Sequence, residues 1–305
     1  MFHFTFDLLN HQKMTTKQVE QVITPAGKHF VGNGFFVHNI IPGSQGLSME
    51  RVSPFILLDY NAPHYFAPTG TPRGVGVHPH RGFETVTIAY KGRVEHHDSS
   101  GGGGVIGEGD VQWMTAASGV LHKEFHEKEW SKKGGMFQMV QLWVNLPAKD
   151  KMSKPKYQAL ANDQMGVYEL ENQAGRIEVI AGAYKTTQGP ASTFTPMHLM
   201  NAHLVAGGKA EFNFPAHYNT ALIVLEGKIQ VNDESAVSAN QFALFQNEGE
   251  AFTIEATENA IVLVLSGEPI LEPIAHHGPF VMNTKQELMQ AFEDFNEGKF
   301  GYLED

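Results

Sequence analysis

The sequence predicts an all-β protein of about two domains. Its 305 residues correspond to about two domains at roughly 100–200 residues each. Short segments rich in β-branched and aromatic residues follow one another, and Gly, Asn, Asp and Pro separate them. Because regular helices do not alternate with these segments, the pattern indicates antiparallel sandwiches or barrels rather than a parallel α/β sheet.

The predicted strands follow one another from residue 35 to residue 266. They cover residues 35–41, 55–59, 84–90, 92–97, 110–115, 137–145 and 176–183. The pattern continues over residues 201–205, 220–225, 228–232, 241–246, 251–256 and 260–266. Two stretches are helix-like instead: residues 150–160, which are polar and interrupted by Pro155, and residues 284–298, which open with a Thr cap and close at a Gly.

A weak internal repeat indicates two copies of one β unit. Residues 84–94 resemble residues 219–229, about 135 positions later, and each contains a strand, a Gly turn and the next strand. We therefore predict an N-terminal domain over residues 14–170 and a second domain over residues 171–270. Residues 271–305 form a C-terminal segment with a helix, and residues 1–13 are predicted to be a disordered tail.

Composition excludes several classes of function. The chain has no Cys, which removes disulfides, Fe–S clusters, Cys-type zinc sites and thiol nucleophiles. Its net charge is −11, without a long basic run, which argues against direct nucleic-acid binding. The longest apolar runs have the length of strands, far short of the roughly 18 residues that a membrane span needs. The N-terminus lacks the pattern of a signal peptide, so we expect a cytoplasmic protein without a membrane partner.

The clearest candidate ligands are two short motifs, His-Pro-His at residues 78–80 and His-Lys-Glu at residues 122–124. Each motif places two metal-ligand side chains at positions i and i+2, which share one face of a strand. Two such strands in one barrel would offer three imidazoles and one carboxylate to a single point. These ligands suit Fe, Mn, Ni, Cu, Co or Zn and leave positions for a chelating substrate or O₂.

Other histidines and acids have simpler interpretations. A metalloprotease helix is excluded because Lys123, not Glu, follows His122. Residues 96–98 (His-His-Asp) are interpreted as a solvated turn before a Gly loop, and residues 276–277 as structural histidines. Glu84 is either an inward carboxylate or a paired strand residue, and the sequence leaves both open.

Long ordered motifs then resemble the pirin family of the cupin superfamily. The matching segments are residues 78–86 (HPHRGFETV), 109–116 (GDVQWMTA), 119–124 (GVLHKE), 141–147 (QLWVNLP) and 272–284 (EPIAHHGPFVMNT). The resemblance implies a bicupin: two antiparallel β-barrels of the jelly-roll type packed face to face, with a short C-terminal helix that docks on the N-terminal barrel.

The resemblance also implies a metal site in the N-terminal barrel only. Carried over by motif, the ligands are His78, His80, His122 and Glu124, and they hold one divalent metal ion per chain, with Fe(II) favoured over Mn, Ni, Cu, Co or Zn. The second barrel is expected to lack metal, because its corresponding segments do not repeat the set of ligand residues.

Two functions fit this resemblance. Several bacterial relatives resemble quercetin 2,3-dioxygenases, so a flavonol-like molecule and O₂ are expected substrates of an oxidoreductase, with Glu124 as general base for the flavonol hydroxyl. The alternative is a non-catalytic iron-binding regulator that binds transcription factors or metabolic enzymes. Four aromatic or Met side chains near the motifs offer an apolar slot for the substrate, but residues at this spacing are more often plain core, which is the preferred interpretation. The four side chains are Phe83, Trp113, Met114 and Phe125.

Overall fold

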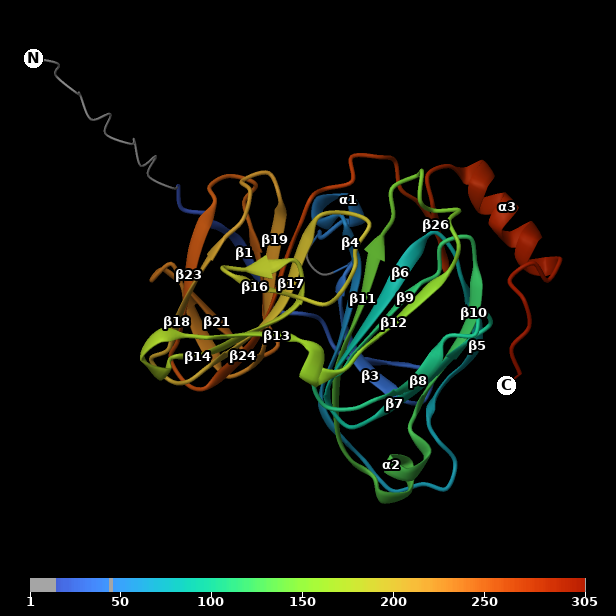
Figure 1. Ribbon diagram of the computed structural model, residues 1–305, viewed down its shortest axis with the longest axis horizontal. Helices are drawn as coiled ribbons and strands as arrows, with labels where there is room; N and C mark the ends of the chain where they lie inside the picture. The colour runs from blue at the N-terminus through green and yellow to red at the C-terminus, as the bar shows by residue number, and fades with distance from the viewer. Residues whose placement is uncertain (1–14, 44–45, 305) are drawn as a thin grey trace, which may run out of the picture.

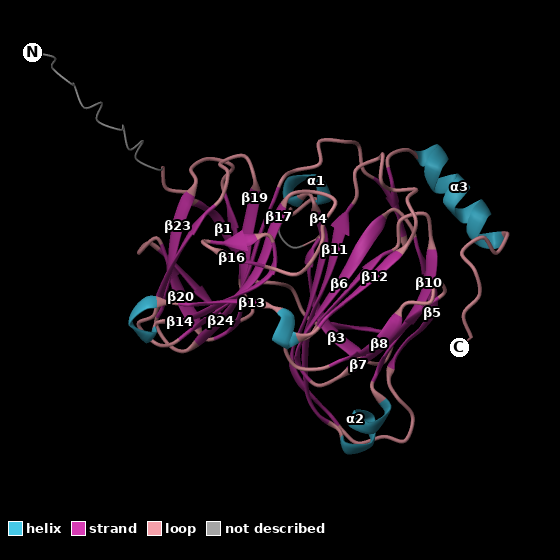
Figure 2. Cartoon of the chain, in the orientation of Figure 1, coloured by secondary structure: helices cyan, strands magenta, loops and turns pink. Residues whose placement is uncertain are grey.

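The fold is all-β, as predicted, and its strands lie in two halves that sit side by side (Figures 1 and 2). The computed structural model describes residues 15–43 and 46–304. The predicted tail, residues 1–13, lies outside the described residues. Each half contains one seven-stranded and one four-stranded sheet, and neighbouring strands run antiparallel.

The first half holds both motifs predicted to bind metal. Its seven-stranded sheet has the order β12 (Lys156–Leu160), β9 (Val111–Thr115), β6 (Phe83–Lys91), β11 (Gly135–Asn145), β4 (Phe55–Phe66), β3 (Phe35–Ile41) and β2 (His29–Val31). Its four-stranded sheet has the order β5 (Gly74–His80), β10 (Val120–His126), β7 (Val94–Asp98) and β8 (Gly103–Ile106).

The second half repeats this arrangement. Its seven-stranded sheet has the order β1 (Val19–Ile23), β22 (Phe242–Phe245), β19 (Asn219–Glu226), β24 (Ala260–Gly267), β17 (Met197–Leu204), β14 (Gly175–Ala181) and β13 (Gly166–Glu169). Its four-stranded sheet has the order β18 (Lys209–Asn213), β23 (Ala251–Ala256), β20 (Lys228–Val231) and β21 (Ser235–Ser238).

Short elements complete the described chain. Two further strand pairs are β15 (Ala183–Tyr184) with β16 (Thr187–Gln188), and β25 (Ala275–His277) with β26 (Phe280–Met282). The helices are α1 (Met49–Val52), α2 (Lys128–Lys133) and α3 (Lys285–Asn296), with single turns at Asn162–Gln164 and Glu171–Gln173. Within the described residues, no helix combines the length and the apolar character needed to cross a membrane.

The two seven-stranded sheets pack against each other, and this contact is the largest core of the molecule. Buried side chains from β4, β6, β9 and β11 share one apolar cluster with side chains from β17, β19, β22 and β24. Tyr60 donates a hydrogen bond across the contact to the carbonyl of Leu225 (3.0 Å). The other face of the first seven-stranded sheet turns toward the four-stranded sheet, so its strands are buried on both faces.

Each half pairs a seven-stranded with a four-stranded antiparallel sheet, as in a jelly roll, and this confirms the predicted fold class. Two details differ from the predicted barrels and domains. Among the described residues, the two sheets of each half are not joined into a closed barrel. Strand pairing also crosses the predicted boundary between the domains, because β1 and β13 belong to the sheet of the second half. The division into residues 14–170 and 171–270 therefore stays a prediction.

Only one of the two predicted helices forms. The prediction over residues 284–298 is confirmed by α3, where Thr284 accepts a hydrogen bond from the backbone of Glu287 and the Glu287 carboxylate accepts one from the backbone of Thr284. The helix predicted over residues 150–160 is wrong. Residues 156–160 form β12, which pairs with β9, and Tyr157 packs against the buried cluster of that sheet.

A nearly buried ion pair fastens α3 to the first half. Arg81 donates to Asp294 (2.8 Å), and Lys299 donates to its other oxygen (2.8 Å). These hydrogen bonds, from Lys299 and then Arg81, hold the pKa of Asp294 well below its usual value. The guanidinium of Arg81 also lies 4.6 Å from the ring centre of Phe300. The helix is therefore held by charge and by an aromatic contact.

Replacing Asp294 with Ala is expected to lower the free energy of unfolding by about 2 kcal/mol, because Arg81 stays buried without its carboxylate. The matched control is Glu297→Ala, which removes an exposed partner of Lys299. This substitution should change the free energy of unfolding by less than about 0.5 kcal/mol. Since the folded pKa of Asp294 is lowered, the loss of stability in the Asp294→Ala variant is present above about pH 4 and shrinks as the pH falls. Urea unfolding of the wild type and both variants at several pH values measures this loss. Equal effects of the two substitutions would contradict this account.

Candidate metal centre

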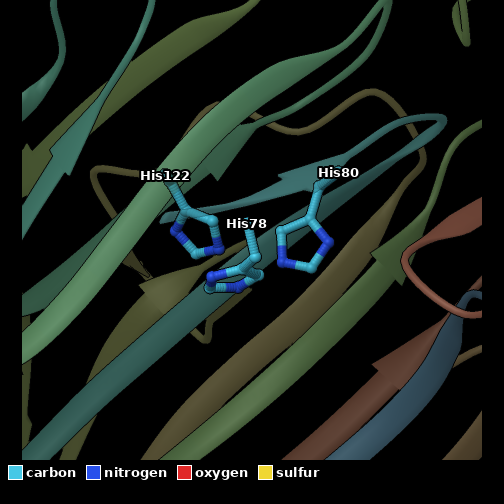
Figure 3. A group of neighbouring side chains, drawn as sticks. All are labelled: His78, His80 and His122. Carbon is cyan, nitrogen blue, oxygen red and sulfur yellow. The ribbon is translucent and has the colours of Figure 1, made fainter. Parts of the chain in front are cut away.

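Three histidines converge on one point between the two sheets of the first half. His78 and His80 lie on β5, and His122 lies on the neighbouring strand β10, directly opposite His78. The ring centres of His78 and His80 lie 4.2 and 4.6 Å from that of His122, and 4.8 Å from each other. Figure 3 shows the three imidazoles gathered together. The alternation along β5 places His78 and His80 on one face, and the pairing of β10 with β5 brings His122 to them.

Hydrogen bonds leave one nitrogen of each ring available. Nδ1 of His78 donates to the carbonyl of Gly76 (2.8 Å), and Nδ1 of His80 donates to the carbonyl of Pro279 (3.4 Å). A carbonyl only accepts, so Nε2 of both rings carries the lone pair. Nε2 of His122 is buried and has no hydrogen-bond partner among the described residues. A buried nitrogen without a partner fits a metal ligand.

Glu124 follows His122 on the same strand and is held by neighbouring side chains. Its Oε1 accepts a hydrogen bond from Nε2 of Gln112 and lies 3.1 Å from Oγ1 of Thr87. Its Oε2 has a longer contact, 3.4 Å, with Nε2 of Gln141. All three neighbours lie on the facing seven-stranded sheet. Oε2 is therefore the less occupied carboxylate oxygen.

The four predicted ligands fall into two adjoining groups. The ligand atoms of His78, His80 and His122 lie within 4.8 Å of one another. Glu124 forms a second such group with His122 and with His96 of β7. His122 belongs to both groups, so Glu124 lies beside the three histidines. Binding of a metal by this set of four stays a prediction.

Burial keeps two of these imidazoles uncharged. Desolvation lowers the pKa of His80 well below its usual value, and the neighbouring His78 lowers it further. Desolvation likewise lowers the pKa of His122, with a further contribution from His80. Neutral imidazole is the form that binds metals. Three imidazoles and one carboxylate together fit a divalent first-row transition metal.

A cavity of about 320 Å³ opens beside this cluster. His78, His80 and Glu124 line it together with Asp59 and Gln141. The remaining lining side chains are apolar: Val31, Phe35, Val37, Leu57, Val75, Met139 and Trp143. A largely apolar cavity with a few polar groups is typical of a small-molecule site.

The alternative of an aromatic slot is wrong, and the preferred core interpretation holds for three of its four residues. Phe83, Trp113, Met114 and Phe125 do not line this cavity. The first three have no exposed surface, and Trp113 belongs to the core between the two halves. The strands β6 and β9 are buried on both faces, so the sequence does not show which face meets the cavity. The cavity-lining side chains come instead from β2, β3, β4 and β11, besides β5 and β10.

Two further interpretations are settled by the structure. The solvated turn predicted at residues 96–98 is wrong, because these residues end strand β7 and His96 and Asp98 are buried. Their i and i+2 spacing was the signal that could have found them. Glu84 is a paired strand residue, because it accepts a hydrogen bond from Thr115 (2.7 Å) and belongs to no candidate metal group among the described residues. Burial raises its pKa to about 7.

Sequence reasoning also missed the side chains that surround Glu124 and the cavity. Thr87, Gln112 and Gln141 contact Glu124, and Asp59 lines the cavity. A polar residue within an apolar strand was the available signal for each of them. These side chains meet at Glu124 and at the cavity because distant strands pair with one another, and the local sequence pattern does not show which strands pair.

Comparison with known proteins places these features in a family. Residues 35–144 match the Pirin family model, and residues 199–301 match the Pirin C-terminal cupin domain. A Pseudomonas aeruginosa protein named "Putative quercetin 2,3-dioxygenase" is 48% identical over 93% of this chain and 98% of its own length. A "Pirin-like protein" of Caulobacter vibrioides is 40% identical over 82% of this chain and 88% of its own length.

A solved structure agrees with this result. The crystal structure of quercetin 2,3-dioxygenase from Acinetobacter baumannii has a TM-score of 0.89 and 47% sequence identity to this chain. The similarity covers 94% of this chain and 99% of that one. The chain belongs to the pirin family, whose C-terminal domain is a cupin domain.

Proposed function

We propose that this protein is a metal-dependent dioxygenase that opens the central ring of a flavonol such as quercetin. Both atoms of O₂ enter the products, and one carbon leaves as CO. The observation that carries this proposal is the group of His78, His80 and His122 with Glu124 beside it, next to a largely apolar cavity that His78, His80 and Glu124 line. The names of the similar proteins from P. aeruginosa and A. baumannii support the same reaction.

The proposed ligands of one divalent metal ion, Fe(II) in the first instance, are His78, His80, His122 and Glu124. The hydrogen bonds at Nδ1 of His78 and His80 fix the direction in which their Nε2 atoms point. When bound, such an ion supplies Lewis acidity and open positions for a chelating substrate and O₂. The two glutamines and Thr87 hold the carboxylate in place.

Glu124 is the proposed general base. Its Oε1 is occupied by Gln112 and Thr87, whereas Oε2 has one long contact with Gln141 and the residue borders the cavity. Oε2 would leave its ligand position as the substrate binds, while the three histidines hold the ion, and would take the proton of the flavonol 3-hydroxyl. The resulting enolate carries the electron density that reacts with O₂. General bases of this kind contribute about 10²–10⁴-fold to a rate.

Asp59 is the proposed acceptor for another hydroxyl of the substrate. It lines the cavity, and Asn39 donates to its Oδ1 (2.7 Å). Burial raises the pKa of this carboxyl. A hydroxyl that donates to Asp59 would orient a flat polyphenol between the apolar walls.

The test is to incubate Fe(II)-reconstituted protein with quercetin in air and to follow flavonol loss together with CO release. We expect both signals in equal amounts, and neither in the metal-free protein. Loss of quercetin without CO would contradict ring opening of this type. The absence of turnover with one bound metal per chain would overturn the proposal and favour the regulatory alternative, for which partner capture is the next experiment.

A further inference from the structure

A second pair of buried polar residues lies directly beside the proposed ligands. His96 and Asp98 occupy alternate positions on β7, which pairs with β10. The pairing places His96 opposite Glu124, and Asp98 opposite His122. His96 has no exposed surface, and Asp98 is 5% exposed. Two buried polar groups at this position need hydrogen-bond partners.

Their contacts form one chain that ends at His122. Nδ1 of His96 lies 3.4 Å from Nδ1 of His122, and Nε2 of His96 lies 3.5 Å from Oδ2 of Asp98. A carboxylate accepts only, so Nε2 of His96 carries the hydrogen and its Nδ1 has the lone pair. Nδ1 of His122 then donates to His96. This order leaves the lone pair of His122 on Nε2, the buried nitrogen without a partner.

The far end of the chain is firmly anchored. Oδ1 of Asp98 accepts hydrogen bonds from the backbone (2.8 Å) and hydroxyl (2.6 Å) of Ser100 and from the backbone of Gly102 (3.0 Å). Burial raises the pKa of Asp98, but hydrogen bonds from His96 and then Ser100 outweigh it and bring the pKa to about 2. Asp98 is therefore a fixed carboxylate.

An aromatic ring holds the middle of the chain. Tyr157 of β12 stacks on His96, with ring centres 5.3 Å apart and planes inclined by 12°. Both nitrogens of His96 already face a partner, one toward His122 and one toward Asp98. To ligate a metal directly, His96 would have to release one of these contacts.

We propose that His96 and Asp98 position His122 for metal binding and fix its tautomer, and that His96 is not itself a ligand. This inference rests on the proposed metal site. An acceptor on the nitrogen opposite the metal orients a histidine ligand and raises its basicity. Loss of such a partner lowers metal affinity by about 10–100-fold.

The test measures the affinity of the full chain for Co(II) by chelator competition, without any substrate. His96→Ala should lower the affinity by about 10–100-fold. His96→Gln should recover most of it, because the amide oxygen can accept from Nδ1 of His122. The matched control is His97→Ala: this neighbour is exposed, pairs with Glu95, and should leave the affinity unchanged.

X-ray absorption at the Co edge separates positioning from ligation. The imidazole count should be the same in the wild type and in the His96→Ala variant. A count lower by one would show that His96 is a ligand, and an unchanged affinity would show that it has no role; either result overturns the inference. The experiment contains no flavonol, so it can be interpreted even if the protein does not catalyse the proposed reaction. If the wild type bound no Co(II), both the proposed metal site and this inference would be wrong.

Discussion

Replacing His122 with Ala is expected to remove the metal. The substitution deletes the imidazole shared by both groups of candidate ligand atoms. Metal content after dialysis should fall from one ion per chain to below about 0.1, because the remaining donors no longer surround the ion. Metal analysis of the Fe(II)-loaded protein measures the effect, and circular dichroism verifies that the variant is folded.

The control for this experiment is His126→Ala. His126 lies on the same strand and is equally buried, but it packs against Phe66 and Phe137 and donates to the carbonyl of Gly34 (2.8 Å). Its loss should reduce stability and leave the metal bound. Since His122→Ala also creates a cavity, His78→Ala serves as a second variant at a less buried position. Retention of one ion in both the His122 and the His78 variants would refute the ligand assignment.

Glu124→Gln is expected to separate metal binding from turnover. The amide keeps an oxygen for Gln112 and Thr87, so part of the metal should remain bound. The amide cannot take a proton from the substrate, so turnover per bound metal should fall by about 10²–10⁴-fold. Steady-state kinetics with quercetin, normalised to metal content, give this value.

The matched control is Glu84→Gln. Glu84 is a buried glutamate of the same half and bonds to Thr115, outside the candidate metal groups. This variant should keep both the metal and the turnover of the wild type. If Glu124→Gln turned over quercetin at the wild-type rate per metal, Glu124 would not be the base.

The shared direction of His78 and His80 could be predicted because it depends on local periodicity. In a strand, residues two positions apart share a face, so the spacing of His78 and His80 already placed their imidazoles together. Helix α3 was equally predictable, since the Thr cap at its start and the Gly at its end are local signals. The resemblance to pirins then connected β5 with β10.

The burial of His96, the direction of Trp113 and the pairing of β1 could not be predicted, because they depend on contacts between distant parts of the chain. His96 precedes a Gly loop, and its burial depends on the pairing with β10 and on the ring of Tyr157 that stacks on it. Trp113 lies on a strand buried on both faces, so its pattern could not show that it faces the second half. Strand β1 pairs with β22, more than two hundred residues later in the chain, in the sheet of the second half.

Anomalous diffraction at the iron edge, from crystals grown with Fe(II), tests the metal centre most directly. The account predicts one peak per chain, about 2.0–2.2 Å from Nε2 of His78, His80 and His122 and from a carboxylate oxygen of Glu124. His96 should lie outside that distance, with its Nδ1 facing His122. A peak bound by His96 in place of His78 and His80, or no peak between these side chains, would contradict it.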